Sequence, residues 1–280
     1  MAIVEDSGWW FLKTMARKHR VASGRSQREV GEYVYRSEDT IRAWELGRTD
    51  IPLNALAVYA KACGISDEIA GYMRQVAEAR KNPEKAIEAD MRFNALFLAL
   101  AEEYSCDIFK FDALIIPGPL QIGEYHDDVV RAIDPKATNK NLEDGWEFKL
   151  ERAAALAARG DRPTIHFLIG EAALLMLRQV SKEIYRKQMA HLRRWAKKPG
   201  VSIRILRAPV SGRLANFDIY LSGKNQAACP PFVYTEIADS SWCIDDPTRI
   251  ARYDEIRKML WKMATRIEDY HDDDRRDRLA

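Results

Sequence analysis

Positive charge gathers near the N-terminus of this 280-residue chain, whose net charge is only +2. The segment 13–28 contains six cations and no anion, and Arg36, Arg42 and Arg48 follow at six-residue spacing. Lysine and arginine side chains bind phosphate. A local basic face can do so even in a nearly neutral protein, because salt confines the field of each charge to roughly 10 Å. The same pattern also fits a solvated surface with scattered ion pairs. The secondary-structure elements that carry the cations are therefore needed to choose between a phosphate-binding face and a solvated surface.

Those elements are predicted to be two short helices. Ser26 and Glu29 have the spacing of a capping box and open the first of them, while Ser37 opens the next, which Gly47 ends. Gly31 lies where the two helices must pass closely. The apolar residues for the buried side of the pair are Val30, Val34, Ile41 and Trp44. In this layout the later helix can enter the major groove of DNA while the earlier one lies across the backbone.

With these positions, residues 12–65 resemble the helix-turn-helix domain of the phage-repressor and xenobiotic-response-element class. In that class a glutamine opens the second helix, a threonine or serine caps the third, and Glu-x-Gly closes it. Gln27, Ser37 and the segment 45–47 match these positions. The resemblance implies a five-helix bundle with DNA as its ligand. It also implies an ion pair between Glu45 and an arginine of the first helix, for which the matching position is Arg20. We interpret this pair as structural.

Geometry assigns candidate roles for DNA binding along this segment. At a helix start, Gln27 and Arg28 can donate to a phosphate, and Arg48 and Thr49 just past the third helix are placed for the same task. Arg36 and Ser37, directly before the third helix, are further candidates. The residues predicted to face the base edges are Glu38, Asp39, Thr40, Arg42 and Ala43.

The two acidic residues at the start of the third helix leave alternatives open. Glu38 and Asp39 can accept a hydrogen bond from cytosine N4, with Arg42 contacting guanine or phosphate. A carboxylate also repels phosphate, so a second interpretation is that the domain binds DNA only weakly by itself. A third is that both carboxylates merely favour the positive end of the helix dipole.

The remainder of the chain is predicted to be a larger domain. We predict a helix-turn-helix domain at 1–82, a connecting segment at 83–92, a mixed α+β domain at 93–270 and a charged tail at 271–280. The order of the elements, helices first and then strands mixed with helices, indicates the α+β class. A long helix is predicted from Pro247 to Tyr270, with an apolar stripe that suits a core or a dimer interface. That stripe comprises Ile250, Tyr253, Ile256, Met259, Leu260, Met263 and Ile267.

The phrase at residues 116–125, behind such an N-terminal domain, resembles an actinobacterial group of antitoxin-like regulators. Pro119 within the phrase and Gly170 before Glu171 depart from the pattern of that group. The resemblance implies a transcription regulator that is often encoded beside a small partner protein. Because operators of such domains are commonly paired half-sites, we also expect a homodimer.

Other classes of protein find little support in the sequence. No apolar run approaches the roughly 20 residues that cross a bilayer, and the start of the chain lacks a secretion signal. Four dispersed cysteines indicate reduced thiols of a cytoplasmic protein. We expect no cofactor, no metal site and no enzyme activity, because no nucleotide-binding, metalloprotease or hydrolase motif occurs. The histidine-aspartate runs at 126–128 and 271–274 are interpreted as solvated charge.

One cluster is left open, because the sequence does not tell whether distant residues converge on one pocket. Its members are Glu171, Glu236 and Asp239 with Arg204 or Arg207. Two hypotheses follow for the whole chain. The first is a DNA-binding regulator whose C-terminal domain dimerises and senses a ligand or a small protein. The alternative is an antitoxin-like interaction protein that binds a cognate small protein and contacts DNA only for autoregulation.

Overall fold

The computed structural model describes residues 7–81, 91–133, 138–211, 216–223, 227–236 and 241–271. The chain forms two compact units, of which the first comprises residues 1–100 with two short segments, 229–231 and 237–241. The second unit contains the rest of the chain. The predicted connecting segment 83–92 lies outside the described residues except at its last two positions, and the predicted tail does so except at His271.

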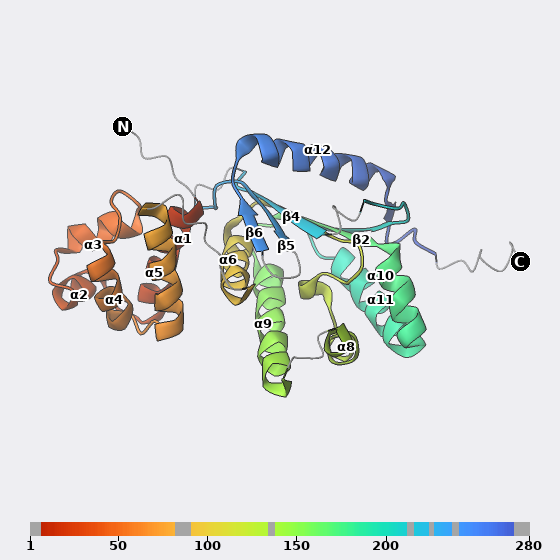
Figure 1. Cartoon of the computed structure of the whole chain (residues 1–280), viewed down its shortest axis with the longest axis horizontal. Coiled ribbons are helices and arrows are strands. Elements are labelled where there is room, and N and C mark those ends of the chain that lie inside the picture. The colour runs from red at the N-terminus through yellow and green to blue at the C-terminus, as the bar shows by residue number, and fades with distance from the viewer. Residues whose placement is uncertain are drawn as a thin grey trace, which may run out of the picture. The chain divides into compact units, whose positions relative to one another are not determined.

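The N-terminal unit begins with five helices, as the sequence predicts (Figure 1). Aromatic contacts join its helices: Phe11 contacts Tyr72 with ring centroids 5.1 Å apart, and Trp10 meets Phe97 at 5.8 Å. The five helices are α1 (Ser7–Ala22), α2 (Gln27–Tyr33), α3 (Glu38–Glu45), α4 (Leu53–Ala62) and α5 (Asp67–Lys81).

The second unit is built on a seven-stranded sheet of order β6-β5-β4-β1-β2-β3-β7. Its centre is parallel, because β1 pairs with β2 and β2 with β3 in the same direction, whereas β4, β5 and β7 pair antiparallel to their neighbours. The strands are β1 (Asp107–Asp112), β2 (Thr164–Gly170), β3 (Val201–Leu206), β4 (Asn216–Leu221), β5 (Phe232–Glu236), β6 (Ser241–Ile244) and β7 (Thr265–Arg266).

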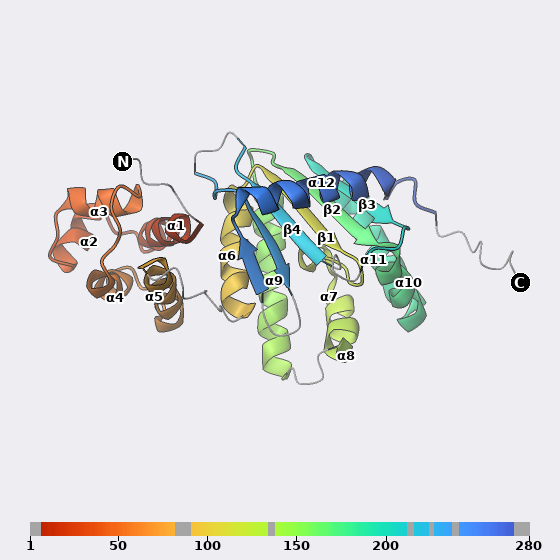
Figure 2. The ribbon, with the colours of Figure 1, turned by 45° about the horizontal axis from the view of Figure 1, so that its top comes forward.

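Helices cover both faces of this sheet, with α12 on one side and α9, α10 and α11 on the other (Figures 1 and 2). Under α12 the sheet is apolar, with Phe109, Phe111 and Phe217 buried in one cluster with Leu260. The helices of the unit are the end of α6 (Met91–Tyr104), the short turns η1 (Gly118–Leu120), α7 (Gly123–Tyr125), η2 (His126–Val130) and α8 (Arg131–Ile133), and the longer α9 (Asn139–Ala158), α10 (Glu171–Val180), α11 (Lys182–Ala196) and α12 (Pro247–Met263).

This arrangement refines the predicted α+β class. Helices and strands are mixed as expected, but β1, β2 and β3 are parallel strands joined by helical crossovers, which is an α/β arrangement. Sequence patterns did not predict β1, because Lys110 interrupts its apolar run.

The predicted long C-terminal helix is shorter than expected. The helix α12 ends at Met263, and Ala264 is already extended. Thr265 and Arg266 then pair with β3, because the edge of β3 offers backbone partners that a continued helix would leave unused. The predicted apolar stripe is accordingly divided: Leu260 is buried, whereas Met259 and Met263 are about half exposed.

No helix in the described part of the chain combines the length and the apolar character that a bilayer-spanning segment needs. Within the same residues, no three His, Cys, Asp or Glu side chains come together in a way that could hold a metal ion.

Candidate functional site

The helix pair α2–α3 begins where the sequence predicts. The Ser26 hydroxyl accepts from the Glu29 amide at 3.2 Å, and a Glu29 carboxylate oxygen accepts from the Ser26 amide at 2.7 Å. Ser37 caps α3 in the same way, accepting from the Thr40 amide at 3.2 Å. Both starts are therefore specified by local hydrogen bonds that replace missing intrahelical partners.

The turn between the two helices is tight. A Cβ atom added to Gly31 would lie 2.7 Å from the Arg36 carbonyl oxygen, so the predicted close approach is confirmed. Tyr35 has a φ of 55°, a left-handed conformation that is uncommon outside glycine, and its side chain is 87% exposed. Sequence analysis did not single out Tyr35, and its place in the short segment between the two predicted helices was its one available signal.

A buried ionic network holds the C-terminal end of α3 against α1. Arg20 donates to both carboxylate oxygens of Glu45, at 2.5 and 2.9 Å, as the resemblance implied. Gln27 and Tyr59 also donate to this carboxylate, both at 2.8 Å. Burial disfavours the charge on Glu45, but the bonds from Arg20, Gln27 and Tyr59 outweigh it and lower the pKa of Glu45. The network fixes which way α3 faces.

The side-chain amide of Gln27 is therefore occupied inside the protein. The sequence assigned Gln27 to phosphate contact, but its side-chain nitrogen donates to Glu45 instead. The physical reason is that Glu45 has four lone-pair sites to satisfy away from water, and Arg20 fills only part of them. The Gln27 side-chain nitrogen carries a second N–H and the residue is partly exposed, so its phosphate contact stays a prediction.

The outward face of α3 carries the residues predicted to meet base edges. Ile41, Trp44 and Glu45 are buried on the inner side, while Glu38, Asp39 and Arg42 are exposed. Arg42 contacts both carboxylates, at 3.0 Å from Glu38 and 3.2 Å from Asp39. Thr40 and Ala43 lie at the margin of this face and are partly exposed. Acidic groups thus hold the guanidinium of Arg42 on its own helix.

Further cations flank this face. Arg28 pairs with Glu32 on the exposed side of α2, and Arg36 donates to the Tyr35 carbonyl at 2.9 Å. Arg48 lies in the exposed loop after α3. All three arginines therefore lie in or next to the α2–α3 pair.

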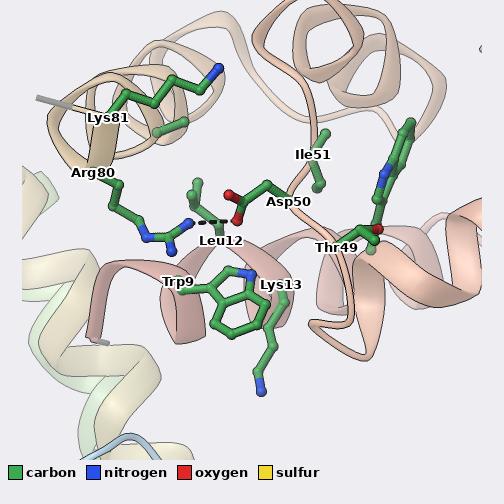
Figure 3. Close-up of a pocket in the computed structure, with 10 residues that line it drawn as sticks. Trp9, Leu12, Lys13, Thr49, Asp50, Ile51, Arg80 and Lys81 are labelled. Carbon is green, nitrogen blue, oxygen red and sulfur yellow. Dashed lines mark hydrogen bonds and ion pairs between the residues drawn. The ribbon is translucent and has the colours of Figure 1, made fainter. Parts of the chain in front are cut away.

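The loop that carries Arg48 and Thr49 is tied to α5. A small pocket of about 60 Å³ lies beneath it, with Thr49 and Trp9 in its wall (Figure 3). Arg80 crosses this pocket, donating to Asp50 at 2.6 Å and lying 5.4 Å from the Trp9 ring centroid. An ion pair and a cation–π contact therefore restrain the loop next to Arg48.

The second unit brings together part of the cluster that the sequence left open. Glu171 and Arg207 form an ion pair at 3.0 Å. Arg204 instead donates to the Trp261 carbonyl, and Glu236 accepts from Tyr234. Asp239 lies outside the described residues.

A buried charge cluster in the same unit was missed by sequence analysis. Lys110 of β1 pairs with Glu102 at 2.9 Å and also with Asp218 of β4, and Arg152 of α9 reaches Glu102 at 2.6 Å. Burial and the nearby Asp218 raise the pKa of Asp112 to about 8. The available signal was a charged residue, Lys110, between two phenylalanines. Its cross-strand partner Asp218 can be identified only from the register of β1 against β4.

The interpretation of the run at 126–128 as solvated charge holds for the exposed Asp127 and Asp128 but is wrong for His126, which the fold buries. His126 is buried, its Nε2 lies 2.9 Å from the Leu142 carbonyl, and its Nδ1 lies 3.0 Å from the Lys149 amine. Both ring nitrogens are used within the protein. Burial lowers the pKa of Lys149 to about 8, with help from the positive charge of Arg152.

A known protein family matches the C-terminal part of the chain. A family described as a domain of unknown function, DUF5753, matches residues 97–271. No curated protein and no solved structure matches the chain.

Proposed function

The chain belongs to the DUF5753 family, whose match covers more than half of it, and we propose that this member is a sequence-specific DNA-binding transcriptional regulator. In this proposal α2 and α3 form a helix-turn-helix and α3 is the recognition helix. The second unit dimerises and senses a ligand or a small protein partner encoded nearby, and the chain acts by binding rather than by catalysis.

The observation that carries the proposal is that α3 is anchored through a buried inner face and exposes its outer face. The diameter of an α-helix with its side chains, about 10–12 Å, fits the major groove of DNA, which is about 12 Å wide. Its inner residues Ile41, Trp44 and Glu45 are buried, and the Arg20–Glu45 pair anchors it. The face with Glu38 and Arg42 is exposed. A rigid helix with an exposed polar outer face is what groove binding requires.

The flanking arginines support backbone contact. Arg28, Arg36 and Arg48 lie at the start of α2, before α3 and after α3, so they border the same face from three places. Phosphate contacts fix the register of a helix in the groove, while base contacts read the sequence. Thr49 and Ser37 are the hydroxyl groups beside these arginines.

The acidic residues of α3 determine how strongly the helix prefers one DNA sequence over others. Arg42 shares its guanidinium between Glu38 and Asp39, so reading a guanine requires it to leave these partners or to bridge them to the base. That local competition lowers non-specific affinity, because two carboxylates face the phosphates with one cation between them.

The test begins with selection from a pool of random duplexes by the full chain, followed by binding titrations at several salt concentrations. A dimer that uses three arginines in each copy makes about six phosphate contacts, for which affinity should fall about 10³-fold between 50 and 200 mM salt. We expect Arg48→Ala to weaken all duplexes alike and to flatten the salt dependence, whereas Arg42→Ala should relax base preference.

The matched control is Arg74→Ala, which removes an exposed arginine from α5, where it pairs with Glu78. It should leave binding unchanged. Recovery of no enriched sequence by the wild-type chain, or an equal loss in Arg74→Ala and Arg48→Ala, would contradict the proposal.

Glu38→Gln separates the two roles of the acidic residues. If Glu38 accepts from cytosine, the variant weakens the selected site and leaves other duplexes unchanged. If Glu38 only repels phosphate and restrains Arg42, the variant binds every duplex more tightly.

One observation favours the second candidate, an antitoxin-like interaction protein with weak DNA contact. Glu38, Asp39 and Arg42 together give the α3 face an excess of negative charge, which suits a basic protein partner better than a nucleic acid. Under this alternative a cognate small protein protects Glu38 and Asp39 from solvent, and DNA binding is measurable only near the chain's own gene.

A further inference from the structure

A cavity of about 370 Å³ lies in the second unit at the carboxyl ends of the three parallel strands. Residues within two positions of the ends of β1, β2 and β3 contribute to its wall, namely Leu114, Glu171 and Arg207. Carboxyl ends of parallel strands meet at one edge of a sheet, and this edge is where α/β proteins commonly bind ligands. The volume lies at the lower end of the range for small-molecule sites, roughly 300–1,000 Å³.

The strand ends lie close together at this edge, so the cavity is formed by the loops that follow the strands. A Cβ atom added to Gly170, the last residue of β2, would lie 2.2 Å from the Ala113 carbonyl oxygen. Only glycine fits there, so the backbones after β1 and β2 touch.

Two opposite charges line the cavity. The Arg207 Nε atom lies 3.0 Å from a carboxylate oxygen of Glu171, and the same oxygen accepts from the Tyr270 hydroxyl at 3.2 Å. A second nitrogen of Arg207 donates to the His271 carbonyl at 2.7 Å, and its guanidinium lies 4.8 Å from the Tyr270 ring centroid. Among the described residues, these contacts hold both groups in place through one oxygen of Glu171 and two nitrogens of Arg207.

The rest of the wall is apolar. Leu114 is 55% exposed at the cavity, although its neighbours Ala113 and Ile116 are buried. Leu175 of α10 and Val210 after β3 complete this side. An apolar side chain that remains in water beside a charged pair can gain by packing against a ligand.

We propose that this cavity binds a small zwitterion with an apolar side chain, of the apolar α-amino acid class. The ligand's ammonium group binds the remaining oxygen of Glu171, its carboxylate binds Arg207, and its side chain packs on Leu114, Leu175 and Val210. A simple anion meets repulsion from Glu171, and a simple cation meets repulsion from Arg207. A ligand with both charges satisfies both groups.

Binding at this cavity is independent of DNA contact, and only its use as a regulatory signal rests on the proposed function. It is therefore measured on the full chain without DNA. A chain that fails to bind DNA but binds the amino acid contradicts the proposed function alone, and the reverse result contradicts this inference alone.

The probes are L-leucine, L-leucinamide, N-acetyl-L-leucine and glycine, titrated by calorimetry and by ligand-observed NMR. L-Leucinamide lacks the carboxylate, N-acetyl-L-leucine lacks the ammonium group, and glycine lacks the apolar side chain. We expect saturable binding of L-leucine at millimolar or lower concentration. Each of the other three probes should bind at least tenfold more weakly, because each loses one of the three contacts.

Two variants test the location. Glu171→Gln should weaken L-leucine at least tenfold. Ala172→Trp, at an exposed position in the wall, should abolish binding by filling the opening while leaving the Glu171–Arg207 pair intact. The matched controls are Ala172→Ser and Glu183→Gln, the latter at an exposed carboxylate of α11 that pairs with Lys187. Both controls should bind as the wild type does.

Three results would each overturn the inference. The first is the absence of binding by L-leucine, L-valine and L-phenylalanine up to 10-fold above the millimolar range. The second is equal binding of L-leucine and its two blocked derivatives, which would show an apolar site without charge recognition. The third is wild-type affinity in Ala172→Trp with an unchanged circular dichroism spectrum, which would place the ligand elsewhere.

Discussion

Removing the charge of Glu45 should strongly destabilise the N-terminal helices. Glu45→Gln keeps the size of the side chain but leaves the Arg20 guanidinium, whose side chain is 13% exposed, without its counter-charge. Glu45 accepts four hydrogen bonds, two from Arg20 and one each from Gln27 and Tyr59. Breaking a buried pair from one side costs about 3–5 kcal/mol, and we expect about 3 kcal/mol because Arg20 retains some contact with water.

The measurement is hydrogen exchange of peptides from α1 to α5 in the full chain, since two units need not unfold together. A loss of about 3 kcal/mol lowers the unfolding temperature of a domain of this size by roughly 12–24 °C. The pH dependence provides a second reading. The pKa of Glu45 is lowered in the folded state, so its stabilisation is present above the ordinary carboxyl pKa and is lost as the pH falls below it. Glu45→Gln should lack this loss.

Two comparisons make the reasoning refutable. Glu78→Gln breaks the exposed Arg74–Glu78 pair and should cost less than about 0.5 kcal/mol. The double variant Arg20→Met, Glu45→Gln should cost less than the sum of the two single changes, because it leaves no unpaired charge. If Glu45→Gln costs no more than Glu78→Gln, the network does not anchor α3.

Two further predictions concern local space and buried charge. Gly31→Ala should destabilise by about 1–3 kcal/mol, because its Cβ meets the Arg36 carbonyl at 2.7 Å. Gly71→Ala, in open space on α5, should instead stabilise by about 0.5–1 kcal/mol. If urea unfolding shows the two variants changing the free energy of unfolding in the same direction, the packing at Gly31 is contradicted. Asp112 keeps a proton in the folded state up to pH about 8, so stability should fall by up to about 1.4 kcal/mol per pH unit between pH 5 and 7. Asp112→Asn should remove this slope and the exposed Asp128→Asn should not; a slope that persists in Asp112→Asn would assign the proton to another group.

Short-range signals explain why the N-terminal helices were predictable. The Ser26–Glu29 capping box, the Ser37 cap and the positive φ of Gly47 each involve residues within a few positions of one another. Helix ends depend on such local hydrogen bonds, so they can be read without knowing the rest of the chain. The Arg20–Glu45 pair spans 25 residues and was reached only through the resemblance.

The second unit was predictable in its elements and not in their arrangement. The mixture of helices and strands was expected, but β1 was missed and the last helix was expected to run past Met263. Both errors have the same origin. Lys110 is tolerated inside β1 because Glu102 and Asp218 lie beside it, and Thr265 leaves the helical path because β3 offers an edge.

The amino-acid order by itself determined the starts of α2 and α3, the division into a helical part and a mixed part, and the candidate cations around residues 26–49, because each depends on near neighbours along the chain. Tertiary structure decided the parallel order of β1, β2 and β3, the internal use of the Gln27 side chain, and the meeting of Glu171 with Arg207. Strand pairing and ion pairs across many residues depend on which surfaces pack together. That choice is made by the whole fold and leaves no trace in local spacing.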